Sequence, residues 1–153
     1  MRRVLYLDDL AVGGKFATAS VTLTLEGCKA FAAEFDPQPF HLDDAAARES
    51  VFGRLAASGW YTASLSMRLI VEGEFTIAGG LIGLGAELSW PRPAYPGDTL
   101  HVETEVLAIR VSESKPDRGV VTVRNQTLNQ HGEPVQITVV KMLVPRRPRA
   151  VSA

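Results

Sequence analysis

One apolar segment, residues 60–71, places the strongest constraint on how this chain can fold. Its apolar side chains recur at helical spacing and form a wide face: Ala63, Leu65, Met67, Leu69 and Ile70. Strand-like sequence flanks it on both sides, at residues 16–25, 81–90, 99–111, 120–128 and 135–144. The sequence therefore predicts an α+β fold, an antiparallel sheet wrapped around one long central α-helix. We expect a single domain of residues 1–145, followed by a basic, frayed and solvated tail of residues 146–153.

Turn and cap signals divide the rest of the chain. Residues 95–98 (Tyr-Pro-Gly-Asp) and 129–132 (Asn-Gln-His-Gly) predict tight connections between strands. Thr24 is a candidate N-cap for a helix that is expected to end at Asp36, because Pro37 follows. The apolar residues of this helix recur at helical spacing: Cys28, Phe31, Ala32 and Phe35.

Residues 35–43, Phe-Asp-Pro-Gln-Pro-Phe-His-Leu-Asp, place a carboxylate, Asp36, five positions before an imidazole, His41. Pro37 and Pro39 lack a backbone donor and disfavour helical angles in the residue before each, so the segment is predicted to be stiff and non-helical. A carboxylate and a group that titrates near neutral pH on a stiff loop suit proton transfer. The alternative is structural, because Asp before Pro often opens a turn and a lone histidine is more often structural than catalytic.

Charge and composition favour some classes of function over others. A formal net charge of -1 gives no global electrostatic reason to bind nucleic acid or an anionic membrane. No apolar run approaches the length of a membrane span, and residues 1–9 turn acidic too soon for a secretory signal, so we expect a cytoplasmic protein. The single Cys28 is interpreted as a packing residue, and three scattered histidines predict no metal site.

With these elements placed, the chain resembles the hot-dog fold and, more narrowly, the MaoC-like dehydratases and (R)-specific enoyl-CoA hydratases. The similarity spans residues 7–144 and is carried by Asp36 to His41 with Leu42-Asp43, Phe52-Gly53-Arg54, Ala57-Ser58-Gly59-Trp60 and Tyr95-Pro96-Gly97-Asp98. The resemblance implies reversible syn addition of water to a trans-2-enoyl-CoA, giving a 3-hydroxyacyl-CoA, with Asp36 and His41 holding and activating the water. It also implies a thioester substrate on CoA or acyl-carrier protein, no separate cofactor, and a homodimer or dimer of dimers.

Further site residues follow from the same comparison. Gly59 is the predicted oxyanion hole, because amides at a helix start are unpaired and lie at the positive end of the dipole; the alternative is an ordinary helix-start glycine. Candidate substrate contacts are Phe40, Ser58, Trp60 and Gly85. The chain departs from well-known members at Gln38 (usually Asn), at Phe40 (usually Leu or Ile) and at Met67, where some members have a serine that supports the aspartate.

Two other functions remain open on the sequence alone. The domain could be a non-catalytic module that binds acyl thioesters, or it could be a thioesterase. Hot-dog thioesterases generally carry their acid on the long helix, whereas here only Glu72 lies near its end, which argues against hydrolysis. Arg54, Arg68 and the tail arginines are candidate contacts for CoA phosphates, with plain solvent exposure as the alternative.

Overall fold

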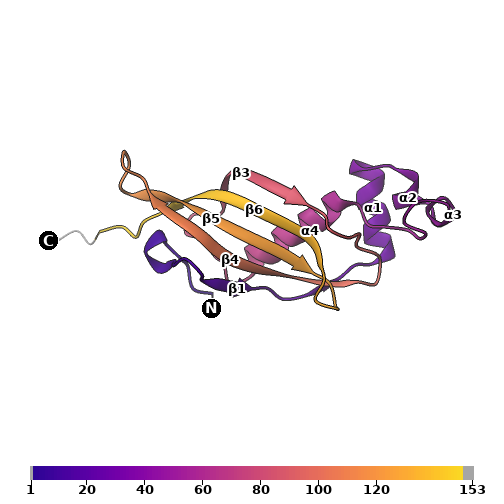
Figure 1. Cartoon of the computed structure of the whole chain (residues 1–153), viewed down its shortest axis with the longest axis horizontal. Coiled ribbons are helices and arrows are strands. Elements are labelled where there is room, and N and C mark those ends of the chain that lie inside the picture. Colours follow the sequence, from indigo (N-terminus) through magenta and orange to yellow (C-terminus); the bar gives the residue numbers. More distant parts are fainter. Residues whose placement is uncertain (1, 150–153) are drawn as a thin grey trace.

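A long helix lies against one face of a strongly twisted antiparallel sheet in the computed structural model, which describes residues 2–149 (Figure 1). The strand order is β1-β4-β5-β6-β3, and the short β2 also pairs with β4. The elements are the 3-10 helix η1 (Leu7–Asp9), β1 (Lys15–Ala17), β2 (Val21–Thr22), α1 (Leu25–Phe35), α2 (Pro39–Leu42), α3 (Asp44–Arg48), α4 (Gly59–Glu72), β3 (Ile82–Ser89), β4 (Thr99–Val111), β5 (Arg118–Leu128) and β6 (Pro134–Pro145). The predicted fold, an antiparallel sheet with one long helix against it, is confirmed.

The hydrophobic core has two parts, one under each half of the molecule. In the first, Leu69 and Ile70 of α4 pack on the valines of the central strands, including Val102, Val106 and Val123. The second lies beneath α1 and contains Leu23, Cys28, Ala47, Leu55, Ala57, Ala94, Leu100 and Val135. Burying one of its leucine or valine side chains contributes about 1.5–3 kcal/mol, and the cluster packs α1 and α3 against the start of α4.

The buried face of α4 differs from the predicted one. Leu69 and Ile70 are buried as expected, but Met67 is 52% exposed, and Thr62 and Ser66 are buried in its place. The Ser66 hydroxyl is 2.7 Å from the Thr62 carbonyl oxygen and 2.6 Å from the Thr127 hydroxyl. The buried hydroxyl of Ser66 is tolerated because it has hydrogen-bond partners inside the core.

The strand predicted at residues 16–25 is instead two short strands, β1 and β2. The cause is Thr18, whose hydroxyl accepts a hydrogen bond from the Val102 amide at 2.9 Å and so replaces a backbone partner in the ladder. Leu25 begins α1 rather than ending a strand. Thr24 caps this helix as predicted, because its hydroxyl accepts from the Gly27 amide at 3.0 Å.

The proline-rich segment is only partly non-helical. Helix α1 ends at Phe35 as expected, and residues 36–38 are irregular. Residues 39–42 form the short helix α2, so the prediction of a wholly non-helical segment is wrong. Pro39 occupies the first helical position, where an amide donor is not needed and the fixed φ of proline suits the helix.

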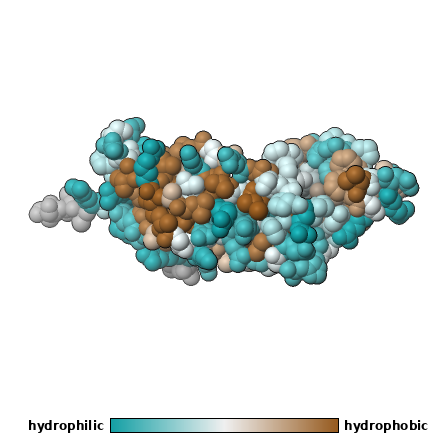
Figure 2. Space-filling view, viewed as in Figure 1, coloured by the Kyte–Doolittle hydropathy of each residue, from teal (hydrophilic) through white to brown (hydrophobic). Residues whose placement is uncertain are grey.

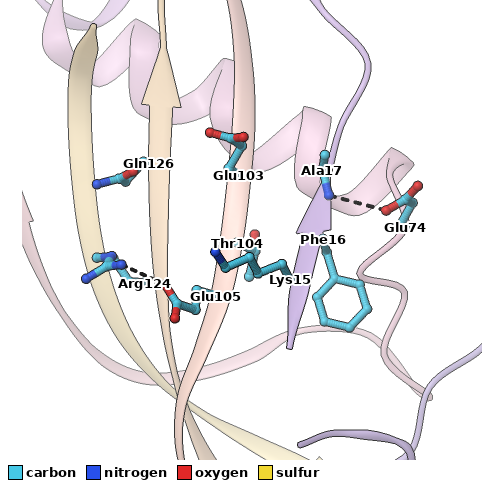
Figure 3. A pocket seen from close by; sticks show the side chains of 9 residues that line it. All are labelled: Lys15, Phe16, Ala17, Glu74, Glu103, Thr104, Glu105, Arg124 and Gln126. Carbon is cyan, nitrogen blue, oxygen red and sulfur yellow. Dashed lines mark hydrogen bonds and ion pairs between the residues drawn. The ribbon is translucent and has the colours of Figure 1, made fainter. Parts of the chain in front are cut away.

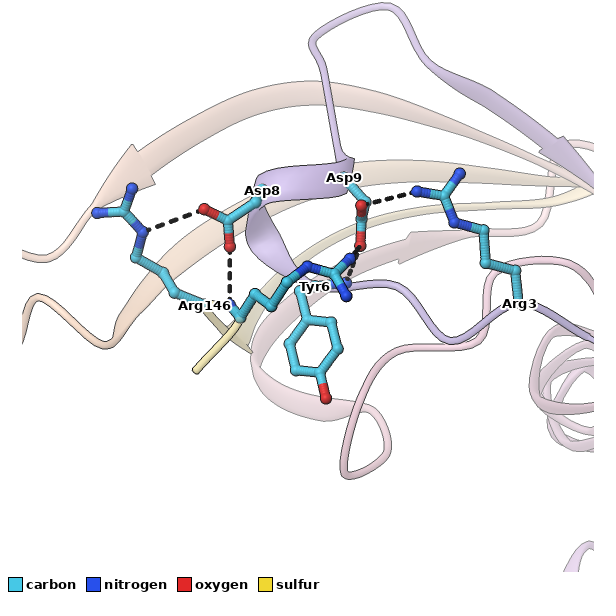
Figure 4. A network of polar contacts seen from close by, with 6 residues as sticks. Arg3, Tyr6, Asp8, Asp9 and Arg146 are labelled. Atoms are coloured by element: carbon cyan, nitrogen blue, oxygen red, sulfur yellow. Dashed lines mark hydrogen bonds and ion pairs between the residues drawn. The ribbon is translucent and has the colours of Figure 1, made fainter. Parts of the chain in front are cut away.

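The chain beyond β6 is held against the N-terminal segment (Figure 4). The Arg147 amide donates to Asp8 at 2.7 Å, and the Arg147 guanidinium lies 2.7 Å from Asp9. Arg146 lies 3.5 Å from Asp8. The expected frayed tail therefore does not begin at residue 146, and residues 150–153 of that prediction lie outside the described residues.

Strand β3 forms one edge of the sheet and is largely exposed along its length. Its apolar side chains Ile82 and Leu84 are 51% and 56% exposed. The space-filling view shows apolar surface over the strands in the half of the sheet nearer the C-terminus (Figure 2). An unpaired edge and exposed apolar side chains together make this side of the molecule a candidate for association.

Candidate active site

Asp36 and His41 are brought together by the turn between α1 and α2. Asp36 is the C-cap of α1, and His41 lies in the third position of α2. The intervening chain is tightened by backbone hydrogen bonds from the Gln38 amide to the Asp36 carbonyl and from the His41 amide to the Gln38 carbonyl. As a result, Asp36 Oδ2 lies 3.3 Å from His41 Nε2, and their side chains are only 15% and 7% exposed.

The ring of His41 is fixed in orientation by its other nitrogen. Nδ1 lies 2.7 Å from the carbonyl oxygen of Ala56, and a carbonyl can only accept, so Nδ1 carries hydrogen and donates. Phe40 packs edge-on against the imidazole, with ring centroids 4.6 Å apart, and Phe52 lies close to both rings. In the neutral ring the lone pair is therefore on Nε2, the nitrogen that faces Asp36.

The carboxylate of Asp36 accepts hydrogen bonds on both oxygens. Gln38 Nε2 donates to Oδ1 at 2.6 Å and the Ser58 hydroxyl donates to Oδ2 at 2.6 Å. Burial alone would raise the pKa of Asp36, but the bonds from Ser58 and Gln38 and the nearby His41 outweigh burial and lower it. Asp36 is therefore ionised at neutral pH, and Gln38, where the resemblance leads one to expect Asn, supports the carboxylate.

Ser58 links the carboxylate to the start of α4. It is fully buried, and as the N-cap of α4 its hydroxyl accepts from the Trp60 amide at 3.2 Å while donating to Asp36. Ser58 does not line the cavity that holds Asp36, so its role in the structure is to position this carboxylate, and the expected substrate contact stays a prediction. Ser64 and Ser66, near the position of the family's supporting serine, bond to Trp60 and Thr127 and not to Asp36.

Gly59 is the first residue of α4 and faces the same space as Asp36. Among the described residues its amide has no hydrogen-bond acceptor, as expected at a helix start. A Cβ atom on Gly59 would lie 2.5 Å from Cε2 of the Trp90 ring. Glycine is thus required by packing as well as by any close approach of a ligand to the amide.

Asp36, His41 and Gly59 line one cavity of about 370 Å3, here called the dyad cavity. Its other lining residues are Gln38, Phe52, Ala57, Trp60, Thr62, Trp90, Pro91, Arg92, Pro93, Ala94 and Val135. This volume falls within the usual range for small-molecule sites. The convergence of the three predicted residues on one space is the central geometric feature of the site.

The remaining predicted contacts are distributed differently. Trp60 lines the dyad cavity, and its ring meets Trp90 edge-on at 5.1 Å. Phe40 lies behind His41 and does not line the cavity. Gly85 lies in β3 beside an irregularity in its pairing with β6 and is also not a lining residue.

Trp90 is a site residue that the sequence did not predict, and it has the most specific contacts among the unpredicted residues of the cavity wall. It follows β3 directly, and its indole Nε1 donates to the Gln136 side chain at 3.0 Å, which holds the ring over Gly59. The only local signal was an aromatic residue between a strand and Pro91. Its contacts with Gly59 and Gln136 join segments distant in sequence, so no local pattern could reveal them.

A second cavity, of about 320 Å3, lies away from these residues (Figure 3). Because Thr104 points toward the core, its neighbours Glu103 and Glu105 point to the outer face of β4. Glu105 pairs with Arg124 at 2.7 Å, and none of the residues of the dyad cavity contributes to this cavity.

Within residues 2–149 no cluster of His, Cys, Asp or Glu could hold a metal ion. None of the helices in that range combines the length and the apolar character that a membrane span requires.

Comparison with known proteins agrees with this geometry. The MaoC like domain family matches residues 9–130. The (R)-specific enoyl-CoA hydratase of Aeromonas caviae is 38% identical over 126 residues, covering 82% of this chain and 88% of that protein. The uncharacterized protein YdeM of Bacillus subtilis is 34% identical over 131 residues, covering 81% of this chain and 87% of that protein.

A solved structure shows the same relationship in three dimensions. The MaoC-like dehydratase from Rhodospirillum rubrum superposes with a TM-score of 0.93 at 58% identity, covering 95% of this chain and 99% of that one. The fold is therefore the hot-dog fold expected from the sequence. Both the matched residues and the superposition extend over most of the chain, which belongs to the MaoC-like dehydratase family.

Proposed function

We propose that the protein catalyses reversible syn addition of water to a trans-2-enoyl-CoA, giving a 3-hydroxyacyl-CoA. The observation that carries this proposal is the dyad cavity, in which Asp36, His41 and the free amide of Gly59 face one space. The (R)-specific enoyl-CoA hydratase among its relatives supports the reaction class. The thioester is the substrate, and the reaction as proposed requires no separate cofactor.

The two polar side chains are suited to hold one water molecule. Asp36 is an ionised acceptor, and the Nδ1–H of His41 leaves the lone pair of the neutral ring on Nε2. A water that bridges Oδ2 and Nε2 can therefore donate one hydrogen to each. Its oxygen is then activated for attack on C3 of the enoyl group, and the same pair can return a proton to C2 on the same side, which gives syn addition.

The start of α4 supplies the complementary electrophilic assistance. A thioester oxygen that accepts from the Gly59 amide lies at the positive end of the helix dipole. This interaction polarises the conjugated system, makes C3 electrophilic and stabilises the enolate that forms after attack. A donor of this kind typically lowers a barrier by about 2.7–4 kcal/mol.

The alternative reactions receive less support. A hot-dog thioesterase would need its acid on α4, and the acid there, Glu72, is 60% exposed and pairs with Arg68 at the far end of the helix from Gly59. A purely binding module would not need a histidine with a fixed tautomer beside an ionised carboxylate. Both alternatives remain outcomes of the experiment below.

The experiment follows the ultraviolet enoyl band of crotonyl-CoA. Wild-type protein should remove the band, and Asp36→Asn and His41→Ala should each slow its loss by about 10²–10⁴-fold, the range for lost acid–base catalysis. Asp117→Asn and His101→Ala, which lie outside the dyad cavity, are matched controls and should retain activity. Thiol release with an intact band would indicate a thioesterase, and binding with neither signal would indicate a module.

We also propose that the chain assembles as a homodimer or dimer of dimers through its β3 side. The exposed Ile82 and Leu84 and the unpaired edge support this assembly. Light scattering at micromolar concentration should give at least twice the chain mass, and a monomer would contradict the proposal. A cytoplasmic location stays a prediction from the sequence.

A further inference from the structure

A third cavity, of about 300 Å3, adjoins the dyad cavity and is here called the arginine cavity. It is lined by Arg54, Arg92, Pro93, Tyr95, Asp98, Asn129, Gln130, His131 and Glu133. Arg92 and Pro93 line both cavities, so the two are separated only by the loop between β3 and β4. This loop and the β5–β6 hairpin lie at the end of the sheet nearest α1 (Figure 1). A ligand longer than the dyad cavity can extend into the arginine cavity along these shared residues.

Arg54 is the unpaired cation of this cavity. Its guanidinium lies 3.5 Å from the centroid of the Tyr95 ring, which fixes its plane, and no described carboxylate lies within ion-pair distance of it. Three of the other arginines considered as phosphate contacts, Arg68, Arg146 and Arg147, are already engaged. Arg68 pairs with Glu72, and Arg146 and Arg147 bind the two aspartates of the N-terminal segment.

The two acids of the arginine cavity are committed to internal contacts. Asp98 accepts from the Tyr95 amide at 2.8 Å and from Gln130 Nε2 at 3.0 Å. Glu133 pairs with Arg92 at 2.8 Å and accepts from the Asn129 side-chain amide. These contacts shape the walls of the cavity and leave the donors of Arg54 available for an anion.

We infer that the arginine cavity receives the phosphate of the pantetheine arm that carries the acyl group, with Arg54 as its main contact. The inference rests on the proposed function, because a pantetheine thioester seated at Asp36 and His41 carries its phosphate away from the reacting carbons. Guanidinium groups bind phosphate oxygens through two parallel hydrogen bonds, and the Tyr95 ring holds Arg54 ready for this geometry. Coenzyme A and a phosphopantetheinylated carrier protein share this phosphate.

The test compares substrates with and without phosphate in wild type, Arg54→Ala and Arg54→Lys. For crotonyl-CoA, Arg54→Ala should raise KM about three- to tenfold with little change in kcat, since a charge-assisted bond is lost at an exposed and therefore screened position. The lysine variant keeps the charge without the planar fork and should fall between the two. Crotonyl-pantetheine, which lacks the phosphate, should be turned over equally by all three proteins. Arg68→Ala is the matched control and should leave both substrates unaffected.

Calorimetric titration with CoA itself separates this inference from the reaction. Weaker CoA binding by Arg54→Ala than by wild type supports the phosphate site even if no hydration is found. The inference would be overturned if wild type and Arg54→Ala bound CoA with equal affinity, or if wild type did not bind CoA. It would also be overturned if Arg54→Ala raised KM for crotonyl-pantetheine as much as for crotonyl-CoA. A loss with crotonyl-CoA but not with a crotonyl carrier protein would identify CoA as the source of the phosphate, and losses with both would show that the site accepts the phosphate from either source.

Discussion

The Ser58→Ala substitution tests the most connected polar contact in the site. The change removes one hydroxyl that both donates to Asp36 and caps α4. Loss of an N-cap costs about 1 kcal/mol, and loss of a hydrogen bond to a charged group costs about 1.5–3 kcal/mol. Because Gln38 still donates to Asp36, the lower figure applies, and the total loss of unfolding free energy should be about 2.5 kcal/mol at neutral pH.

The pH dependence of this loss identifies its origin. The folded-state pKa of Asp36 is lowered from 3.8, so its contribution to stability is fully present above pH 3.8 and is lost as pH falls through the lower folded value. Below that folded-state pKa the Asp36 carboxyl is protonated in both the folded and the unfolded protein. The difference in unfolding free energy between Ser58→Ala and wild type should then shrink to the contribution of the lost N-cap, about 1 kcal/mol.

Thermal and urea unfolding across this pH range measure the effect. At neutral pH the melting temperature should fall by about 5–10 °C, from about 2–4 °C per kcal/mol for a chain of this size. Ser64→Ala is the matched control, because Ser64 lies on the exposed side of the same helix and bonds only to the Trp60 carbonyl; its effect should stay within about 0.5 kcal/mol. A loss for Ser58→Ala that does not change with pH would refute the link to Asp36.

Two further predictions concern packing and the chain termini. Gly59→Ala places a Cβ against the Trp90 ring and should lower the free energy of unfolding by about 1–3 kcal/mol, as measured by urea unfolding. When Trp90→Ala is also present, the ring is gone and Gly59→Ala should cost much less. Additive losses in the double variant would contradict the clash. Arg147→Ala should speed hydrogen exchange in residues 145–149, and so should high salt. Lowering the pH through the depressed pKa values of Asp8 and Asp9 should reduce the protection factors of these amides, which compare each exchange rate with that of an unstructured peptide at the same pH, because protonation removes the charges that hold Arg147. Protection factors that do not respond to salt or pH would argue against this contact.

Local signals in the sequence offered Asp36 and His41 as a candidate pair, and the resemblance to the MaoC-like family singled them out. The spacing of Asp36 and His41 and the helix stop before Pro37 are encoded within a few residues, and the structure places the two side chains 3.3 Å apart. The cap at Thr24 was found for the same reason. Structural features that depend only on residues close together in the sequence were therefore predictable.

Features set by distant contacts were not predictable from local patterns. Thr18 interrupts a strand because its hydroxyl replaces a ladder partner on β4, and alternation alone cannot show this. Ser58 supports a carboxylate 22 positions earlier. The prediction that Pro39 excludes helix was wrong for a different reason: proline is compatible with the first position of a helix, and Pro39 begins α2.

The position of Trp60 and Trp90 has a practical consequence. The chain contains two tryptophans, and both line the dyad cavity. All of the indole fluorescence of the protein therefore originates at the wall of the candidate active site. A thioester that enters the cavity displaces water from these rings, so its arrival can be followed by intrinsic emission without any attached dye.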